Sequence, residues 1–286
     1  MTVNASAREA RPRDGNLRDP CDLRVETSAS PRLRGQRLVT RIDSLGEGSK
    51  HHSMGKLGIT WFGHSTFLIK TPGGKRLLFD PWLTTNPACP ERLKKPPQAD
   101  LILASHGHGD HIEDLVLCAR TAGAPVVAMY ELCVWLERKG IKQTQPMNMG
   151  GSLDIAGLRV SMTDARHSSG FVEDGQMIYM GAPCGFVIRL EDSRTIYFAG
   201  DTDVFGDMRL IGEIHRPQIA FLPIGDRFTM GPEGAARACA LLGVKQVVPM
   251  HWGTFPLLTG TPTALMPLVE PIGVQVLELK PGETAQ

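Results

Sequence analysis

The sequence predicts an α/β fold, a four-layer αββα sandwich in which two sheets pack face to face with helices outside. Two observations predict it. Each half of the chain begins with short apolar runs that have the length of strands, and each half ends with strands that alternate with helical segments. A sheet with helices on one face must bury its other face against a second layer, so the two halves are expected to cover one another.

The first half starts at Leu57, where short β-type runs are separated by Gly and Pro. We predict strands at 58–62, 66–69, 77–80 and 101–104, with a turn at 71–74 between two of them. A helix at 113–121, a strand at 125–128 and a helix at 131–139 then follow. Gly140 ends the last helix, because glycine adopts the left-handed conformation that closes helices.

The second half repeats this plan. Strands are predicted at 158–162, 184–190, 195–198 and 219–223. A helix at 232–242 is closed by Gly243, and it is followed by a strand at 246–249, a helical segment near 263–269 and a last strand at 274–279. The chain thus consists of two β-rich halves, each finished by βα units, which is the pattern of the predicted sandwich.

Composition excludes several classes of function. Lys and Arg number 31 against 30 acids, and a net charge of +1 gives no electrostatic case for nucleic acid or an anionic membrane. No segment has the about 18 to 20 apolar residues of a membrane helix, and no charged-then-apolar leader opens the chain. The six cysteines lack C-x-x-C spacing, which favours a reducing compartment. We therefore expect a cytoplasmic protein.

Residues 1–53 differ from the rest of the chain. They contain nine Arg and one Lys against seven acids, with few apolar residues, and are interpreted as a disordered N-terminal extension. A basic interaction tail is a weaker reading, because the acids are interleaved. Met54 offers an alternative translation start. The length suits one domain of about 230 residues plus an appendage, so residues 54–286 are assigned to one domain.

The most informative stretch is Ser105-His106-Gly107-His108-Gly109-Asp110-His111. It reads H-x-H-x-D-H and lies between the apolar run 101–104 and a segment of helical spacing. Three imidazoles and a carboxylate are therefore placed at a strand-to-helix turn, where they can converge on one point. A polar turn rich in small residues is the alternative, but three histidines in six positions have no packing reason to cluster. The stretch predicts a metal site.

Three more candidate ligands follow strands in the same way. His167, Asp201 and His251 each lie in a loop after an apolar strand, and such loops converge at one edge of a sandwich. Taken alone, these residues could be a satisfied loop histidine, a turn aspartate and a core histidine. Together with the motif they give five His and two Asp, enough for two divalent ions with positions left open for water.

The longer sequence runs resemble the metallo-β-lactamase superfamily. The runs that carry the resemblance are G-H-S-T-F-L-I, F-D-P-W, H-G-H-G-D-H, P-M-N-M-G-G, R-H-S-S, F-A-G-D-T, L-P-I-G-D-R-F-T-M-G-P and V-P-M-H-W-G-T-F-P. Within the superfamily they are similar to a little-characterised bacterial family of metal-dependent hydrolases, close to ascorbate-phosphate lactonases. The resemblance covers about residues 56–280 and implies the metallo-β-lactamase fold. Trp252-Gly253 departs from the aromatic-Asn pair expected there.

The resemblance implies a dinuclear site. Its ligand sets are His106, His108 and His167 for one ion, Asp110, His111 and His251 for the other, and Asp201 as the bridge. A carboxylate has two oxygens that can serve two cations, and anionic ligands offset the repulsion between cations. A bridging water would then become a hydroxide that attacks the substrate, oriented by Asp110. Zinc is the first choice, and manganese, iron or nickel fit the ligand types nearly as well.

Four further residues are candidates for the site. The resemblance places His64 beside the metals, where it is a catalytic candidate with Asp110, either meeting substrate or donating a proton to the leaving group; a structural role at its turn is the alternative. Asp80 suits an acceptor that fixes a ligand imidazole. Asp226 and Arg227 are expected to line the substrate cavity, where Arg227 pairs with an anionic substrate group or with Asp226. His215 is expected to be a surface residue at a helix end.

The predicted function is a metal-dependent hydrolase that acts on a small ester, lactone or phosphodiester through a metal-bound hydroxide. The alternatives are a phosphodiesterase of the phospholipase or RNA-processing type and a non-catalytic binding module with a structural metal. A β-lactamase is disfavoured because that class is usually secreted. The expected partner is a small-molecule substrate, with no clear nucleic acid and no membrane segment, and the sequence leaves a homo-oligomer open.

Overall fold

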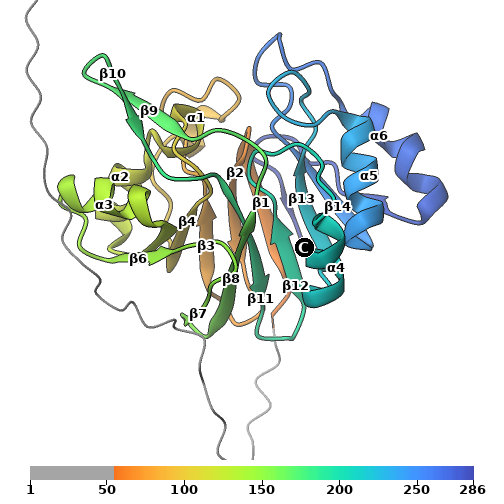
Figure 1. Ribbon diagram of the computed structural model, residues 1–286, viewed down its shortest axis with the longest axis horizontal. Coiled ribbons are helices and arrows are strands. Elements are labelled where there is room, and N and C mark those ends of the chain that lie inside the picture. Colours follow the sequence, from red (N-terminus) through yellow and green to blue (C-terminus); the bar gives the residue numbers. More distant parts are fainter. Residues whose placement is uncertain (1–54) are drawn as a thin grey trace, which may run out of the picture. The chain divides into compact units, whose positions relative to one another are not determined.

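A computed structural model describes residues 55–286; the extension predicted for residues 1–53 and the start at Met54 lie outside the described residues. Two seven-stranded sheets form the centre of the described part, and helices lie on their outer sides (Figure 1). A third, two-stranded sheet is separate from both. This arrangement confirms the four-layer αββα sandwich.

The first sheet combines an antiparallel meander with parallel strands. In sheet order the strands are β16 (Thr284–Ala285), β1 (Gly58–Gly63), β2 (Thr66–Lys70), β3 (Arg76–Phe79), β4 (Leu101–Ala104), β5 (Val126–Met129) and β6 (Thr144–Met147). The strands from β3 to β6 run parallel. Helices α1 (Gly109–Ile112), α2 (Leu115–Ala122) and α3 (Tyr130–Arg138) make the crossovers, and a 3-10 helix (Glu91–Leu93) precedes β4. Parallel strands point their carboxyl ends to one edge of the sheet.

The second sheet is built on the same principle. Its order is β15 (Gln275–Val276), β14 (Gln246–Met250), β13 (Ile219–Pro223), β12 (Thr195–Phe198), β11 (Cys184–Arg189), β8 (Leu158–Asp164) and β7 (Ser152–Ile155). The strands from β12 to β15 are parallel, and those from β12 to β7 are antiparallel. Helices α4 (Met208–His215), α5 (Pro232–Leu242) and α6 (Pro262–Val269), with a final 3-10 helix (Glu270–Ile272), cover its outer side near β12 to β14 (Figure 1).

The separate hairpin consists of β9 (Gly170–Glu173) and β10 (Gln176–Tyr179), which pair antiparallel. It follows the His167 loop directly and extends beside α1 and α2 (Figure 1). Phe171 on one of its faces meets the ring of Trp135 in an edge-to-face contact at 5.7 Å. The hairpin is thus held on α3, since an isolated two-stranded hairpin has little stability in water.

The main core lies between the two sheets. Four aromatic rings form its centre, with Phe67 and Phe79 from the first sheet and Phe198 and Phe221 from the second. The ring centroids of Phe79 and Phe198 are 4.6 Å apart, and those of Phe67 and Phe221 are 5.0 Å apart. Because these rings bury a large apolar area and interlock across the interface, they fix how the sheets, and hence the loops at their edges, are placed.

Most long elements agree with the prediction. Helix α5 has the bounds expected from the sequence, whereas β15 covers only two residues of the predicted strand 274–279. The strands β6, β7, β9 and β10 were not predicted, and of helix α4 only its end at His215 was expected. Strand β6 reads T-Q-P-M, and a short edge strand with proline lacks the apolar pattern on which strand prediction depends.

Two expectations about composition bear on the described residues. The five cysteines in the described part of the chain are buried and form no disulfide, as small apolar residues would. Between residues 55 and 286, every helix is too short or too polar to cross a bilayer.

We predict that Phe67→Ala lowers the free energy of unfolding by about 3–5 kcal/mol, because it leaves a cavity at the sheet–sheet interface. Phe228→Ala is the matched control: the Phe228 side chain is 51% exposed, and its loss is expected to change stability by less than about 0.5 kcal/mol. Urea unfolding followed by circular dichroism measures both. Equal effects of the two substitutions would contradict the assigned core.

Candidate metal centre

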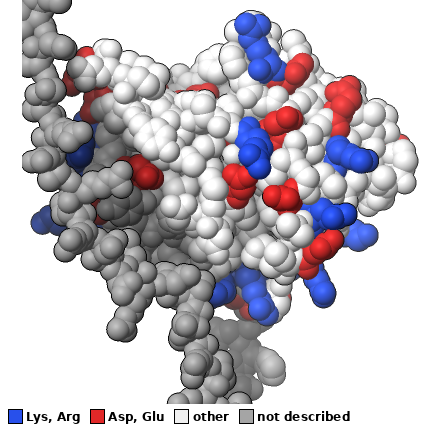
Figure 2. Space-filling model, in the orientation of Figure 1, with Lys and Arg blue, Asp and Glu red and all other residues white. Residues whose placement is uncertain are grey.

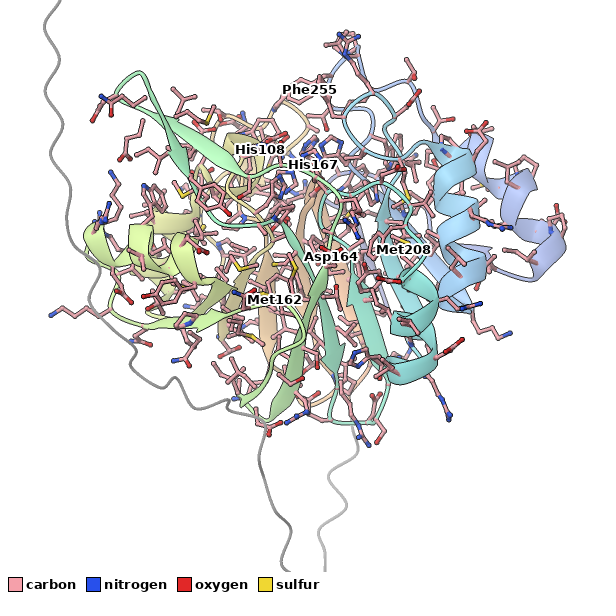
Figure 3. All side chains as sticks on the ribbon, in the orientation of Figure 1. His108, Met162, Asp164, His167, Met208 and Phe255 are labelled. Atoms are coloured by element: carbon pink, nitrogen blue, oxygen red, sulfur yellow. The ribbon has the colours of Figure 1, made fainter. Side chains whose placement is uncertain are left out.

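The predicted ligands converge at one end of the sandwich. They follow β4, β8, β12 and β14, and lie in the loop after the strand or, for Asp110 and His111, in α1. His106 and His251 are more than a hundred positions apart in the chain. Figure 3 shows His108 and His167, from loops of different sheets, beside one another at this end. Carboxyl ends of neighbouring strands meet at the same edge, and here the edges of both sheets contribute.

Three imidazoles form a first group. The Nε2 atom of His106 is 3.0 Å from Nδ1 of His108, and Nε2 of His167 is 3.2 Å from that same Nδ1. Two nitrogens bound to one tetrahedral zinc ion at about 2.0–2.1 Å lie roughly 3.3 Å apart, so the spacing fits a shared cation. The structure thus brings His106, His108 and His167 together as one candidate ligand set.

A second group contains His64, Asp110, His111 and His251. Asp201 lies between the two groups. Its Oδ2 atom is 2.9 Å from Nε2 of His251 and 3.3 Å from Nε2 of His111 on one side. On the other side it is 3.7 Å from Nε2 of His167 and 4.0 Å from Nε2 of His106. Asp201 is therefore the carboxylate that reaches both groups.

Asp80 fixes the protonation of two imidazoles. Its Oδ2 accepts from Nδ1 of His111 at 2.8 Å and from the hydroxyl of Ser105 at 2.6 Å, and its Oδ1 accepts from the Ser105 backbone N–H. The Ser105 oxygen in turn lies 3.0 Å from Nδ1 of His106 and can accept its proton. With both Nδ1 atoms protonated, the neutral rings of His106 and His111 present lone pairs at Nε2, the form that binds a metal.

Some buried nitrogen and oxygen atoms at the centre have no hydrogen-bond partner among the described residues. Among the described residues, Nε2 of His111 and Oδ1 of Asp201 are buried and have no aligned hydrogen-bond partner. The Nε2 lone pair of a neutral His111 faces the carboxylate of Asp201, an arrangement that repels unless a positive charge lies between the two atoms. Imidazole nitrogens and carboxylate oxygens are also the preferred ligands of divalent zinc. The residues present therefore fit a pair of divalent cations.

The pKa values show how strongly the groups are coupled. Burial disfavours the charged forms, yet Asp201 and Asp110 raise the pKa of His111 well above its usual value. Burial likewise opposes ionisation of Asp201, but His111 and His251 hold its pKa well below the usual range. The pKa of His106 is lowered by burial and then by His111. The centre thus combines ionised carboxylates with a positive charge, which a proton on His111 or a bound cation can supply.

Three residues at the centre have strained backbone conformations. His64, Asp80 and His251 have positive φ values of 56°, 43° and 54°, which non-glycine residues seldom adopt. Gly200 has φ 63°, and a Cβ there would lie 2.7 Å from the carbonyl oxygen of Cys184. Only glycine fits this turn, and the turn brings Asp201 into the pocket.

His64 is fully buried, and both of its ring nitrogens have partners. Nε2 lies 3.1 Å from Oδ2 of Asp110, and Nδ1 lies 2.9 Å from the hydroxyl of Thr254. Burial, followed by the charge of His251, lowers the pKa of His64 to about 4. A neutral ring beside an ionised carboxylate must donate from Nε2, so Nδ1 accepts from Thr254.

Asp226 and Arg227 lie in the exposed loop that follows β13. Asp226 Oδ2 accepts a long hydrogen bond of 3.4 Å from Thr259, and the Arg227 guanidinium lies over the Phe228 ring at 5.6 Å. No ion pair joins Asp226 to Arg227 in the structure of residues 55–286. The loop is on the same edge as the ligand loops, because it also follows the carboxyl end of a strand.

Three contributing residues were missed in the sequence. Ser105 links Asp80 to His106, the Ser169 Oγ accepts a 3.0 Å hydrogen bond from the Gly107 N–H, and Thr254 holds His64. Ser105 opens the histidine motif, so its place could have been noticed. Thr254 follows His251 by three residues in an irregular loop, and no pattern identifies it.

Comparisons with known proteins agree with this fold. The family model described as "Beta-lactamase superfamily domain" matches residues 75–252. A UPF0173 metal-dependent hydrolase of Solibacter usitatus is 48% identical over 228 residues, which cover 80% of this chain and 99% of the relative. One from Rubrobacter xylanophilus is 48% identical over 233 residues, 80% of this chain and 96% of the relative.

A solved structure is also similar. It is Igni18, described as a novel metallo hydrolase from Ignicoccus hospitalis, with a TM-score of 0.71 and 36% identity over 80% of this chain and 97% of that chain. The matched share of each relative is nearly complete, so the likeness extends over the whole sandwich and all of its ligand loops. The chain therefore belongs to the UPF0173 family of metal-dependent hydrolases, within the metallo-β-lactamase superfamily.

Proposed function

We propose that this hydrolase cleaves a small ester, lactone or phosphodiester at a dinuclear centre. One ion would be held by His106, His108 and His167, and the other by Asp110, His111 and His251, with Asp201 between them. The observation that carries the proposal is the position of the Asp201 Oδ2 atom, which lies within 4.0 Å of Nε2 atoms on both sides. Zinc is the proposed metal, since nitrogen and oxygen donors dominate the set.

When bound, such ions supply an activated water and polarise the scissile carbonyl or phosphoryl group. The chain's own residues orient the reaction. Asp110 is 30% exposed at its side chain and so faces the open side of the centre, where an attacking water can contact it. Asp80, itself fully buried, keeps the His111 ring in one orientation through its 2.8 Å hydrogen bond.

Arg227, in the loop after β13, favours an anionic substrate. Arg227 is exposed, forms no ion pair with Asp226, and lies on the edge that carries the ligand loops. A guanidinium in that position can bind a phosphate or carboxylate group of the substrate. Over the visible face, positive and negative side chains are interspersed rather than gathered into one basic surface (Figure 2), which supports a small molecule over RNA. The buried free thiols support the cytoplasm as its location.

His108→Ala is expected to abolish turnover of bis-p-nitrophenyl phosphate and of a lactone panel. It removes the Nδ1 atom that lies close to Nε2 of both His106 and His167 in the first group. Metal analysis is expected to fall from about two ions per chain to about one or none. Far-UV circular dichroism checks that the chain stays folded, and His215→Ala, a histidine outside the centre, is the matched control. Full activity of His108→Ala would rule out the assignment of the first ion.

His64 offers a test between positioning and proton donation. We propose that it positions Asp110, so His64→Ala should weaken metal affinity and lower kcat by about 10–100-fold for substrates with good and poor leaving groups alike. A proton donor would instead matter only for the poor leaving group and would leave metal affinity unchanged. Thr254→Val removes only the hydroxyl that holds His64. It should also lower metal affinity and kcat, but by less than His64→Ala does. Loss confined to poor leaving groups contradicts the positioning role.

Chelation is expected to destabilise the fold as well as stop turnover. A ligand that binds only the folded chain adds about 2.7 kcal/mol when its concentration is 100 times its dissociation constant. The thermal unfolding midpoint should therefore fall in excess chelator and recover when zinc is returned. An unfolding midpoint that is the same with and without chelator would contradict binding at this centre.

A further inference from the structure

A polar groove lies on the outer face of the second sheet, away from the metal centre. Its volume is about 600 Å³, and it is bounded by β7, β8, β11, the start of β12 and the C-terminal end of α4. In the described part of the chain, the helices of this side lie over β12 to β14, and none lies over β7 and β8 (Figure 1). The groove is thus a part of the sheet face that the helical layer leaves open.

The floor of the groove consists of hydroxyl groups and the buried side chain of Val187. The Oγ atoms of Ser152 and Ser161 are 2.7 Å apart, on paired strands β7 and β8. Ser161 and Thr195 are nearly buried, with 8% and 7% of their surface exposed. The residues that alternate with them on β8, such as Val160, lie in the core between the sheets. The outward-facing positions of these strands are therefore polar, although helices cover the corresponding positions farther along the sheet.

Arginines surround this floor. Arg159 on β8 and Arg189 on β11 are direct register partners, so their side chains leave the same face of the sheet side by side. Like charges in directly opposed cross-strand positions destabilise a sheet. Asp154 forms an ion pair with Arg159 at 2.8 Å, which leaves Arg189 uncompensated. Within residues 55–286, neither Arg189 nor Arg216 at the end of α4 takes part in an ion pair.

The charge of the groove is one-sided. Its lining includes Arg159, Arg189 and Arg216, and no aspartate or glutamate is among the lining residues. The whole chain has a net charge of only +1, so this is a local concentration of cations. A concave surface with positive charges and hydroxyl groups attracts an anion with several oxygen acceptors.

The groove is distinct from the substrate site. Strand β8 runs from Arg159 at the groove toward Asp164 and the His167 loop at the metal centre. Five residue steps separate Arg159 from Asp164, or roughly 17 Å at the rise of an extended chain, before the loop begins. The same holds for β12, which starts at Thr195 in the groove and leads to Asp201. One molecule of ordinary metabolite size cannot contact both places.

We propose that this groove binds a small phosphorylated molecule as a second ligand, separate from the substrate that is hydrolysed. Arg189 and Arg216 would donate charge-assisted hydrogen bonds to its phosphate oxygens, and the Ser152, Ser161 and Thr195 hydroxyls would line the remaining part. Guanidinium groups match the planar oxygen pairs of phosphate. A volume of about 600 Å³ falls in the range of small-molecule sites. Bound phosphate would also relieve the repulsion between Arg159 and Arg189.

The test is isothermal titration of the metal-loaded full chain with pyrophosphate. The double variant Arg189→Gln with Arg216→Gln is expected to bind at least tenfold more weakly or to lose one binding event. The matched control is Arg138→Gln with Arg237→Gln, which removes the same charge from exposed positions outside the groove. Any binding at the metal centre is common to all three proteins and therefore cancels in the comparison.

The thermal unfolding midpoint of the ligand-free double variant should be unchanged or raised, because a like-charge pair is removed. The single variant Arg216→Gln, at a helix end, serves if the double variant does not fold. Equal affinity in all three proteins would show that pyrophosphate binds only elsewhere, and equal weakening in the two double variants would show a diffuse effect of charge. Either result overturns the proposal. Turnover of the wild-type hydrolase, measured with and without pyrophosphate, tests separately whether the metal centre functions.

Discussion

The buried carboxylate of Asp201 is the constraint on which the rest of the structure depends. A carboxylate removed from water is costly unless positive charge or donors surround it. Here its Oδ2 is surrounded by imidazole Nε2 atoms, and its Oδ1 has no aligned donor among the described residues. Cations bound by these residues would satisfy both the carboxylate and the nitrogen lone pairs. The strained residues around the centre, among them His251 and Gly200, are consistent with a site that the surrounding fold holds in place.

Asp201 can be held there because two sheets, and not one, contribute loops to the same edge. The aromatic contacts between Phe79 and Phe198 fix one sheet against the other, and Phe198 is only three residues before Asp201. Asp80 then orients the imidazole rings of the first sheet. It contacts His111 directly and His106 through the Ser105 hydroxyl. Packing in the core and hydrogen bonding at the edge therefore act together to place the donor atoms.

Sequence reasoning could predict the fold and the metal-binding loops because both leave strong local patterns. H-x-H-x-D-H at a strand-to-helix turn is specific, and strands such as β11 are continuous apolar runs. The hairpin of β9 and β10 and the edge strand β7 lack such patterns, since each strand has only four residues and apolar side chains such as Val172 and Met177 are exposed. Thr254 and Ser105 act through contacts with residues distant in the chain. The pairing of Arg159 with Arg189, which defines the groove, depends on strand register and could not be predicted from either segment alone.

The metal centre and the arginine groove lie at opposite ends of β8, so one strand connects two chemically different surfaces. The metal centre presents nitrogen and oxygen lone pairs that can bind a cation. The groove presents N–H and O–H groups that can donate hydrogen bonds to an anion. The account rests on the first of these surfaces. Anomalous diffraction from crystals of the metal-loaded protein, recorded at the absorption edge of the bound metal, tests it most directly. We predict two peaks, one beside His106, His108 and His167 and one beside Asp110, His111 and His251, with Asp201 touching both. A single peak, or peaks away from Asp201, would contradict it.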